Sequence, residues 1–162
     1  LPTKDKLLLL SENNSLPLSL HTLINELKQK FTMQIIYEKC APEFCHKMAL
    51  STLKRNGYKL SLASNSIKAS IDAMMSRSGL LEYLDFTLSN QDVVHGKPNP
   101  EIYLKSIAMH GCEPHECLIV EDNPHGIAAA KASGAHVLEV SNPSDVTYDK
   151  IKSEIFKIEE QE

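Results

Sequence analysis

Two adjacent carboxylates follow a short hydrophobic run in the last third of the chain. The run is "CLIV" at 117–120, the carboxylates are Glu121 and Asp122, and an alanine-rich segment starts directly afterwards with Asn123. Two like charges side by side repel each other, so the pair is expected to face a positive group. Carboxylate oxygens are also the ligands that a hard cation such as Mg²⁺ prefers. The pair therefore marks a candidate metal site.

A hydroxyl group and a lysine occupy comparable places earlier in the chain. The stretch "LASNS" puts Ser64 and Asn65 after one apolar run, and "GKPNPEIY" carries Lys97 in the loop after another. The free N–H groups at the start of a helix favour an anion, and a lysine neutralises phosphoryl charge. Together with the acidic pair, these residues form the set that holds a phosphoryl group and Mg²⁺.

Each of these residues also has a purely structural interpretation. Ser64 is the type of residue that caps a helix, and Lys97 precedes a turn-forming proline as many solvated lysines do. Glu121 and Asp122 are also typical of a loop that leads into a capped helix. The order and the shared position at strand ends favour the functional interpretation.

Strands and helices that could position these side chains alternate from residue 58 to residue 139. Apolar runs predict strands, and amphipathic stretches that begin with Asn-Pro or end at Gly predict helices. The predicted strands span 58–64, 84–89, 117–120 and 135–140, and the predicted helices span 66–79, 99–111 and 123–134. Such alternation implies a doubly wound parallel sheet in an α/β fold, with ligands at the carboxyl edge of the sheet.

The first 56 residues lack this alternation. Amphipathic spacing predicts one helix over 16–31 and another over 42–57, so the N-terminal part is expected to be helical. The run Leu7 to Leu10 is either a short strand or part of a helix, and the helix fits its surroundings better.

Length, composition and charge exclude several classes of protein. A chain of 162 residues fits one domain with a small appendage, and 42% apolar with 23% charged residues is ordinary for a globular protein. The net charge of −4 gives no basic stripe for nucleic acid or for a membrane surface. The longest apolar run falls far short of the roughly 20 residues of a membrane span. We therefore expect a cytoplasmic protein with no nucleic-acid partner and no membrane partner.

The four cysteines do not predict a disulfide framework, because a chain of this size can bury a sufficient core. The stretch "HGCEPHEC" brings His110, Cys112, His115 and Cys117 together in the sequence and leaves zinc open as an alternative. Its spacing is not CxxC, and no second ligand pair follows at the distance typical of a zinc finger. Reduced thiols and surface histidines are therefore favoured there.

The stretches "LASNS", "GKPNPEIY" and "LIVEDNPHGIAAAKASGA" resemble motifs two, three and four of the haloacid dehalogenase superfamily. The resemblance is closest to the subfamily with an inserted helical cap, which includes phosphoglycolate-type phosphatases and phosphoglucomutases. It implies a Rossmann-like core in which Ser64 and Asn65 bind the phosphoryl group and Lys97 bridges that group and the nucleophile. It also implies that Asp122 ligates Mg²⁺, with Glu121 beside it as a ligand or as a supporting residue.

The sequence departs from this family in its first motif, D-x-D, whose first aspartate is the nucleophile. No two aspartates in the chain are separated by a single residue. In "LLLLSENNS", Ser11 and Asn13 stand where the two aspartates would be, and neither side chain can replace a carboxylate. No histidine in the sequence pattern is placed to activate Ser11 or Ser64. The stretch 1–40 resembles the later part of the cap instead, which makes 41–162 a core without its first strand.

These observations predict a Mg²⁺-dependent phosphohydrolase for a small phosphorylated metabolite such as a sugar phosphate, with its nucleophilic aspartate encoded upstream. Whether this chain is itself an enzyme is left open. The alternatives are a phosphomutase and a non-catalytic module that binds phosphate or a partner. In the cap portion, Lys4, Lys28 and Lys30 are the expected contacts to the substrate. In the family the motif-one strand lies mid-sheet, so a dimer or a missing N-terminal segment is expected to complete the sheet.

Overall fold

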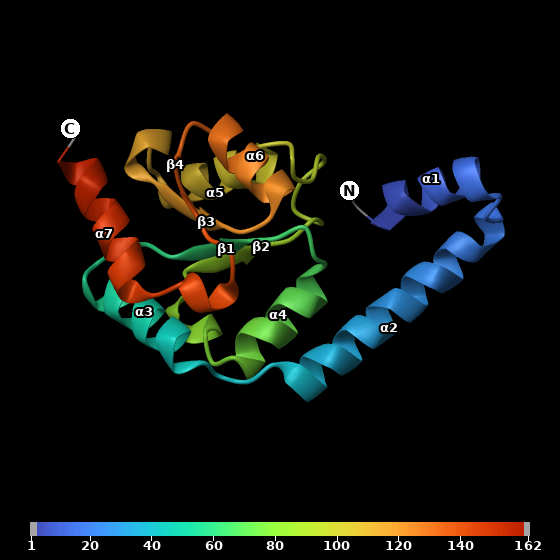
Figure 1. Cartoon of the computed structure of the whole chain (residues 1–162), viewed down its shortest axis with the longest axis horizontal. Coiled ribbons are helices and arrows are strands. Elements are labelled where there is room, and N and C mark those ends of the chain that lie inside the picture. The colour runs from blue at the N-terminus through green and yellow to red at the C-terminus, as the bar shows by residue number, and fades with distance from the viewer. Residues whose placement is uncertain (1–2, 161–162) are drawn as a thin grey trace.

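The computed structural model describes residues 3–160, and within them it contains seven α-helices and four short strands. Helices α1 (Thr3–Asn14) and α2 (His21–Lys39) form a hairpin to one side of the other elements (Figure 1). The remaining elements are α3 (Phe44–Arg55), β1 (Ser61–Ala63), α4 (Lys68–Arg77), β2 (Phe86–Leu88), α5 (Glu101–His110), β3 (Leu118–Glu121), α6 (Pro124–Ala132), β4 (His136–Glu139) and α7 (Tyr148–Glu159).

The N-terminal hairpin confirms that Leu7 to Leu10 are helical, but the helix predicted over 16–31 has the wrong bounds. The chain turns at Ser15, which has a φ of 56°, and passes through a short 3₁₀ turn at Leu18–Leu20 before α2 begins. Pro17 explains the difference, since its extended backbone (φ −60°, ψ 130°) and missing N–H exclude it from a helix interior. The helix then continues to Lys39, eight residues beyond the predicted end.

All strand pairs in the described residues are parallel, which confirms the predicted α/β class, but the strands form two separate sheets. Strand β1 pairs with β2, with Leu62 opposite Thr87, and β3 pairs with β4, with Ile119 opposite Val137. Within residues 3–160 no ladder joins β1 to β3. Each of these two strands therefore keeps one edge whose backbone groups have no strand partner.

Hydrophobic clusters cover both faces of the β3–β4 sheet, as expected for parallel strands. On one face, buried residues of α3 and α7 pack against the end of β4. On the other, residues of α5 and α6 pack against β2, with Ile119 and Val137 beside them (Figure 1). Alternate residues of β3 point to opposite faces, so the ends of the strands are held on both sides.

The apolar residues of α2 are less buried than their spacing predicts. Leu23, Leu27 and Phe31 are exposed, although Ile36 near the end of the helix is buried. None of the helices within residues 3–160 is long and apolar enough to cross a membrane. The assignment of 1–40 to a cap and 41–162 to a core stays a prediction, and α2 ends close to this boundary.

Candidate phosphate and metal site

Lys97 lies in the centre of the predicted site and is only 7% exposed. Its ammonium group donates to the carbonyl oxygen of Ala63 at 2.9 Å and to the hydroxyl of Tyr103 at 2.6 Å, and it also donates to the Glu121 carboxylate. Ala63 ends β1, whereas Glu121 ends β3. A single buried lysine therefore connects the ends of the two sheets.

The Glu121 carboxylate is surrounded by donors of the chain itself. One oxygen accepts from Lys97 and from the Tyr103 hydroxyl at 2.5 Å, and the other accepts from the backbone N–H groups of Asp122 and Asn123 at 3.1 and 3.2 Å. Burial alone would raise the pKa of Glu121, but the hydrogen bonds from Lys97 and Tyr103 outweigh it and hold the pKa below its ordinary value. The carboxylate is thus ionised, and both of its oxygens already accept hydrogen bonds from the chain.

Gly126 leaves the space that this carboxylate fills. A Cβ atom added at this position would lie 2.2 Å from the carboxyl carbon of Glu121 and 2.3 Å from both of its oxygens. Gly126 is buried in the first turns of α6, where backbone N–H groups favour a negative charge. The sequence "EDNPHG" therefore combines an acidic pair with the small residue that makes room for one of its members.

Side chains from neighbouring elements hold the loop that carries Lys97. The Asn65 amide accepts from the Lys97 N–H at 3.0 Å and donates to the Lys97 carbonyl at 3.1 Å. The Glu101 carboxylate accepts from the N–H groups of Val94 and His95, both at 2.8 Å. The Asn65 side chain thus positions Lys97. Its role in phosphate binding stays a prediction, and after these contacts its backbone N–H is the group that remains for an anion.

Ser64 follows β1 directly, and its N–H donates to the Leu88 carbonyl of the neighbouring strand at 3.0 Å. Its hydroxyl oxygen accepts from the N–H of Ser66 at 3.1 Å, which is the local contact of a helix-start serine. Within residues 3–160 the hydroxyl hydrogen has no acceptor, so it remains available to a phosphoryl oxygen. Both interpretations of Ser64 are compatible with this geometry.

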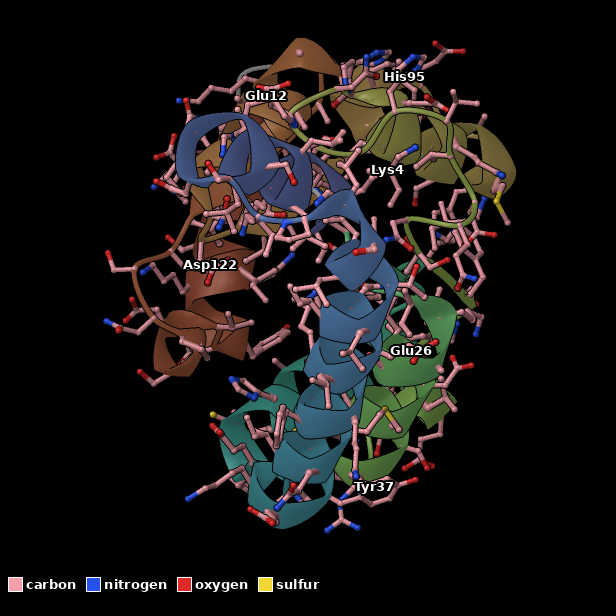
Figure 2. All side chains as sticks on the ribbon, turned by 90° about the vertical axis from the view of Figure 1, so that its right-hand side faces the viewer. Lys4, Glu12, Glu26, Tyr37, His95 and Asp122 are labelled. Carbon is pink, nitrogen blue, oxygen red and sulfur yellow. The ribbon has the colours of Figure 1, made fainter. Side chains whose placement is uncertain are left out.

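Asp122 differs from its neighbour because its side chain is exposed. No donor within residues 3–160 contacts its carboxylate, and it stands at the end of β3, directly after the occupied Glu121. In Figure 2, Asp122 and Lys4 are labelled on opposite sides of α1. A free carboxylate of this kind fits Mg²⁺, which takes one or two carboxylates and completes its coordination with water and phosphate oxygens.

A cavity of about 410 Å³ lies between the N-terminal hairpin and the α/β part. Lys4 and Lys28 line it from α1 and α2, while Asn65 and Ser66 line it from the other side. Lys28 donates to the hydroxyl of Thr3 at 2.7 Å. Lys30 is exposed on α2 and is not part of the lining. Two of the three lysines expected to contact the substrate therefore share a cavity with the start of the predicted phosphate site.

A histidine lies beside Ser11, but it is not placed to activate the serine. The Ser11 hydroxyl oxygen is 2.6 Å from Nε2 of His21 and donates to the Leu16 carbonyl at 2.7 Å. A hydroxyl has a single hydrogen, and the carbonyl can only accept it, so His21 acts as the donor in this pair. The contact closes the turn between α1 and α2 and does not activate the serine.

The zinc alternative at 110–117 gains no support from the geometry. Burial, together with the neighbouring Cys112, raises the pKa of the Cys117 thiol to about 11, so this thiol stays protonated. The Cys112 thiol contacts the His110 carbonyl at 3.7 Å. Within the described residues, these side chains do not form a group with the spacing of metal ligands.

Sequence reasoning missed Tyr103 as a member of the site. Its position in the inner stripe of a predicted helix suggested only packing, and it is indeed 94% buried. Burial and the hydrogen bond to Glu121 raise the pKa of its hydroxyl well above the ordinary value of 10.0, so the hydroxyl remains a donor. The sequence offered one signal, the spacing of the two residues. Tyr103 follows Lys97 by six residues and stands in the first turn of α5, so its side chain can reach back to Lys97.

Parallel strands covered by helices, with a buried lysine and an acidic pair at their carboxyl ends, define a Rossmann-like α/β protein. The family model "Haloacid dehalogenase-like hydrolase" matches residues 6–140, and the chain belongs to this family.

Several relatives are phosphatases by name. A bifunctional riboflavin kinase/FMN phosphatase of Arabidopsis thaliana is 31% identical over 130 residues, which are 80% of this chain and 34% of that protein. Pyrophosphatase PpaX of Bacillus cereus (strain AH820) is 33% identical over 89 residues, which are 55% of this chain and 41% of that protein. The chain thus spans less than half the length of these two relatives.

A solved structure supports the same fold. The crystal structure of β-phosphoglucomutase from Clostridium difficile superposes with a TM-score of 0.78 over 96% of this chain and 77% of that one. The two are 21% identical, so this likeness shows the fold alone. The chain is a haloacid dehalogenase-like hydrolase domain of the α/β class.

Proposed function

We propose that this chain is part of a Mg²⁺-dependent phosphohydrolase that acts on a small phosphorylated metabolite such as a sugar phosphate. The observation that carries the proposal is the buried network of Lys97, Tyr103 and Glu121 at the ends of β1 and β3. A buried ion pair is a weak source of stability, so its place at the carboxyl ends of parallel strands favours a role in binding a ligand.

Each predicted residue has a distinct task in this proposal. The Ser64 hydroxyl and the Asn65 N–H bind phosphoryl oxygens, and Lys97 neutralises part of their negative charge. Asp122 would hold Mg²⁺, with Glu121 either as a further ligand or as the residue that keeps Lys97 in place. When bound, Mg²⁺ would supply additional neutralisation of the phosphoryl group.

In this proposal, the nucleophilic aspartate belongs to a D-x-D strand that lies outside these 162 residues. Its support is the division of the sheet, because the facing edges of β1 and β3 have no strand partner in the described residues. A strand of a preceding segment, or of a second copy of the chain, would pair with both edges. In the same proposal residues 1–40 are the later part of a cap. The exposed side chains of Leu23, Leu27 and Phe31 would then pack against the other part of that cap.

The proposal places the rest of the substrate in the cavity between the hairpin and the α/β part. Lys4 and Lys28 line that cavity, and Lys30 is the outlying member of the set. Charge-removing substitutions of Lys4 and Lys28 should raise KM for phosphorylated substrates, with Lys30→Gln as the matched control. An unchanged KM for every substrate tried would remove these lysines from the site. The free thiols of all four cysteines favour the cytoplasmic location that the proposal includes.

The deciding experiment measures phosphate release from a generic aryl phosphate with Mg²⁺, using this chain and a version that carries a D-x-D segment. We expect release by the longer version only. Asp122→Ala in that version should reduce the rate more than tenfold, which is about 1.4 kcal/mol of transition-state free energy. Activity of the longer variant above a tenth of the parent rate would refute the assignment of Asp122.

A non-catalytic phosphate-binding module is the second candidate, because the Ser64 hydroxyl and the buried Lys97 can bind a phosphate without a nucleophile. Phosphate binding that depends on Mg²⁺ and on Lys97, with no turnover by any extended version, would support this candidate instead. A phosphomutase needs the same aspartate and has no separate observation in its favour.

A further inference from the structure

A group of three potential metal ligands lies away from the phosphate site, at the start of α3. The carboxylate of Glu43, the thiol of Cys45 and the imidazole of His46 have ligand atoms that all lie within 4.8 Å of one another. None of the three takes part in the network around Lys97. Within the described residues, this is the one group of three such side chains with this spacing.

The separations are close to those of a tetrahedral zinc site. Nδ1 of His46 is 3.7 Å and the Cys45 sulfur is 4.0 Å from the same Glu43 oxygen. Zinc–ligand bonds of about 2.0–2.3 Å place ligand atoms about 3.3–3.6 Å apart. The Glu43 side chain is 59% exposed, so it can move by the small distance required without disturbing a packed neighbour.

A contact from a distant segment orients His46. Nε2 of His46 lies 2.7 Å from the carbonyl oxygen of Pro143, which is 97 positions further along the chain. A carbonyl only accepts, so Nε2 carries the hydrogen and Nδ1 is the ring nitrogen that remains for the Glu43 side. Metal-binding histidines commonly donate their second N–H to a backbone carbonyl in this way.

The start of α3 suits a cation bound by anionic ligands. Glu43 precedes this helix, and Cys45 and His46 lie in its first turn, where backbone N–H groups favour negative charge. With Nε2 of His46 directed to the Pro143 carbonyl, Nδ1 faces the Glu43 carboxylate and is the ring nitrogen that a cation would share with it. A divalent cation held by a carboxylate and a thiolate forms a neutral group, which the helix terminus does not oppose.

We propose that Glu43, Cys45 and His46 bind a borderline-soft divalent cation, with zinc as the best match. Thiolate and imidazole ligands favour zinc over Mg²⁺, whereas the carboxylates of the phosphate site have the opposite preference. Three protein ligands leave a fourth position for water or a small anion. The site lies directly after the segment that joins α2 to α3, and through His46 it contacts the turn at Pro143–Asp145. Bound zinc would therefore fasten the junction between the N-terminal hairpin and the α/β part.

The test titrates the full 162-residue chain with Zn²⁺ against a competing chromogenic chelator, and with Co²⁺ to detect thiolate-to-metal absorption in the near ultraviolet. We expect one equivalent to bind, and Cys45→Ser and His46→Ala to weaken zinc affinity at least tenfold. Only Cys45→Ser should remove the near-ultraviolet band while a weaker site remains. Glu43→Gln should also weaken binding, and its exposed position makes misfolding an implausible cause.

Cys112→Ser serves as the matched control and should bind zinc with the parent affinity. Circular dichroism establishes that each variant is folded. Parent affinity in Cys45→Ser, or an equal loss in Cys112→Ser, would overturn the proposal. So would the failure of the parent chain to compete with the chelator. Because none of these readouts is phosphatase activity, the outcome is independent of the proposed phosphohydrolase function.

Discussion

Gly126→Ala tests whether the Glu121 carboxylate is held where the structure places it. The new Cβ would lie 2.2 Å from the carboxyl carbon of Glu121, which is more than 1 Å inside ordinary contact distance. The backbone of α6 cannot retreat easily, because Ala129 and Ala130 on the same helix are fully buried. The carboxylate must therefore leave its position, and with it the contacts to Lys97 and Tyr103.

Three contributions set the size of the effect. Overpacking a filled site costs about 1–3 kcal/mol. Separating a buried ion pair costs about 3–5 kcal/mol when one charge is left without its partner, and less when it finds another donor. Replacing glycine by alanine in a helix returns about 1 kcal/mol. Because the displaced carboxylate relieves the clash, the overpacking cost does not add to the cost of separating the ion pair, and we expect the free energy of unfolding to fall by about 2–4 kcal/mol in Gly126→Ala.

Urea unfolding of the parent chain and of Gly126→Ala measures this difference, provided that the slope with denaturant stays constant. The matched control is the same substitution in a Glu121→Ala background, where the side chain that clashes is absent. There the alanine should stabilise the protein by up to about 1 kcal/mol, because only the helix propensity remains. A loss below about 0.5 kcal/mol in the parent, or an equal loss in both backgrounds, would refute the reasoning.

Three further predictions concern the same region. Tyr103→Phe should lower the free energy of unfolding, measured with urea, by about 1.5–3 kcal/mol, because it removes the hydroxyl that donates to the buried Glu121 carboxylate. Tyr148→Phe is the control and should have little effect, because the Tyr148 hydroxyl accepts from an exposed amide. Ile102→Ala should cost about 2–5 kcal/mol because the side chain is 0% exposed, and Leu104→Ala on the exposed side of α5 should cost clearly less by the same measurement. The pKa of Glu121 is held below its ordinary value of 4.5, so the ionised carboxylate should contribute its full stability above that pH and lose it as the pH falls below it. Thermal unfolding measured between pH 6 and pH 3 should show a smaller fall of the melting temperature with acid in Glu121→Gln than in the parent chain.

The alternation of strands and helices after residue 58 could be predicted because its signals are local. Asn123 accepts from the His125 N–H at the start of α6, and Gly111 ends α5 with a left-handed φ of 65°. Capping and left-handed conformation depend on a few neighbouring residues, so the sequence alone contains that information. Three of the four strands were predicted too long, and the strand predicted over 117–120 spans Leu118–Glu121 instead. Strands stop where pairing stops, and pairing is a tertiary property.

The N-terminal hairpin and α7 were predicted less well. Apolar spacing from Leu20 to Phe31 was continuous with residues before Pro17, so the pattern predicted a helix across a turn. The helix α7 was not predicted at all, although Thr147 accepts from the Lys150 N–H at its start. Ile151 packs against α3 and β4, and with Ile155 and Ile158 it has the i, i+4, i+7 spacing of an amphipathic helix, so this helix could have been predicted from the sequence.

The members of the site could be named from the sequence, but most of their partners could not. The motifs identified Lys97 and the acidic pair without showing that Asn65 would bond to the Lys97 backbone on both sides. The resemblance ranked Asp122 above Glu121 as the metal ligand, but it did not show that Lys97, Tyr103 and two backbone N–H groups already donate to Glu121. These distinctions depend on which donors surround each oxygen, and the side-chain donors lie far from Glu121 in the sequence.

The division of the sheet and the position of Lys97 have one explanation in common. Strands β1 and β3 share no backbone ladder within the described residues, yet Lys97 connects the last carbonyl of β1 to the last carboxylate of β3. A chain selected for stability alone would gain more from apolar side chains at this junction, since a desolvated ion pair recovers little of what its burial costs. The charged contact therefore supports the proposed function. In that proposal it would keep an ammonium group fixed between two strand ends, at the place where an added strand would bring its own last residues, and dry enough for its charge to act strongly on a phosphoryl group.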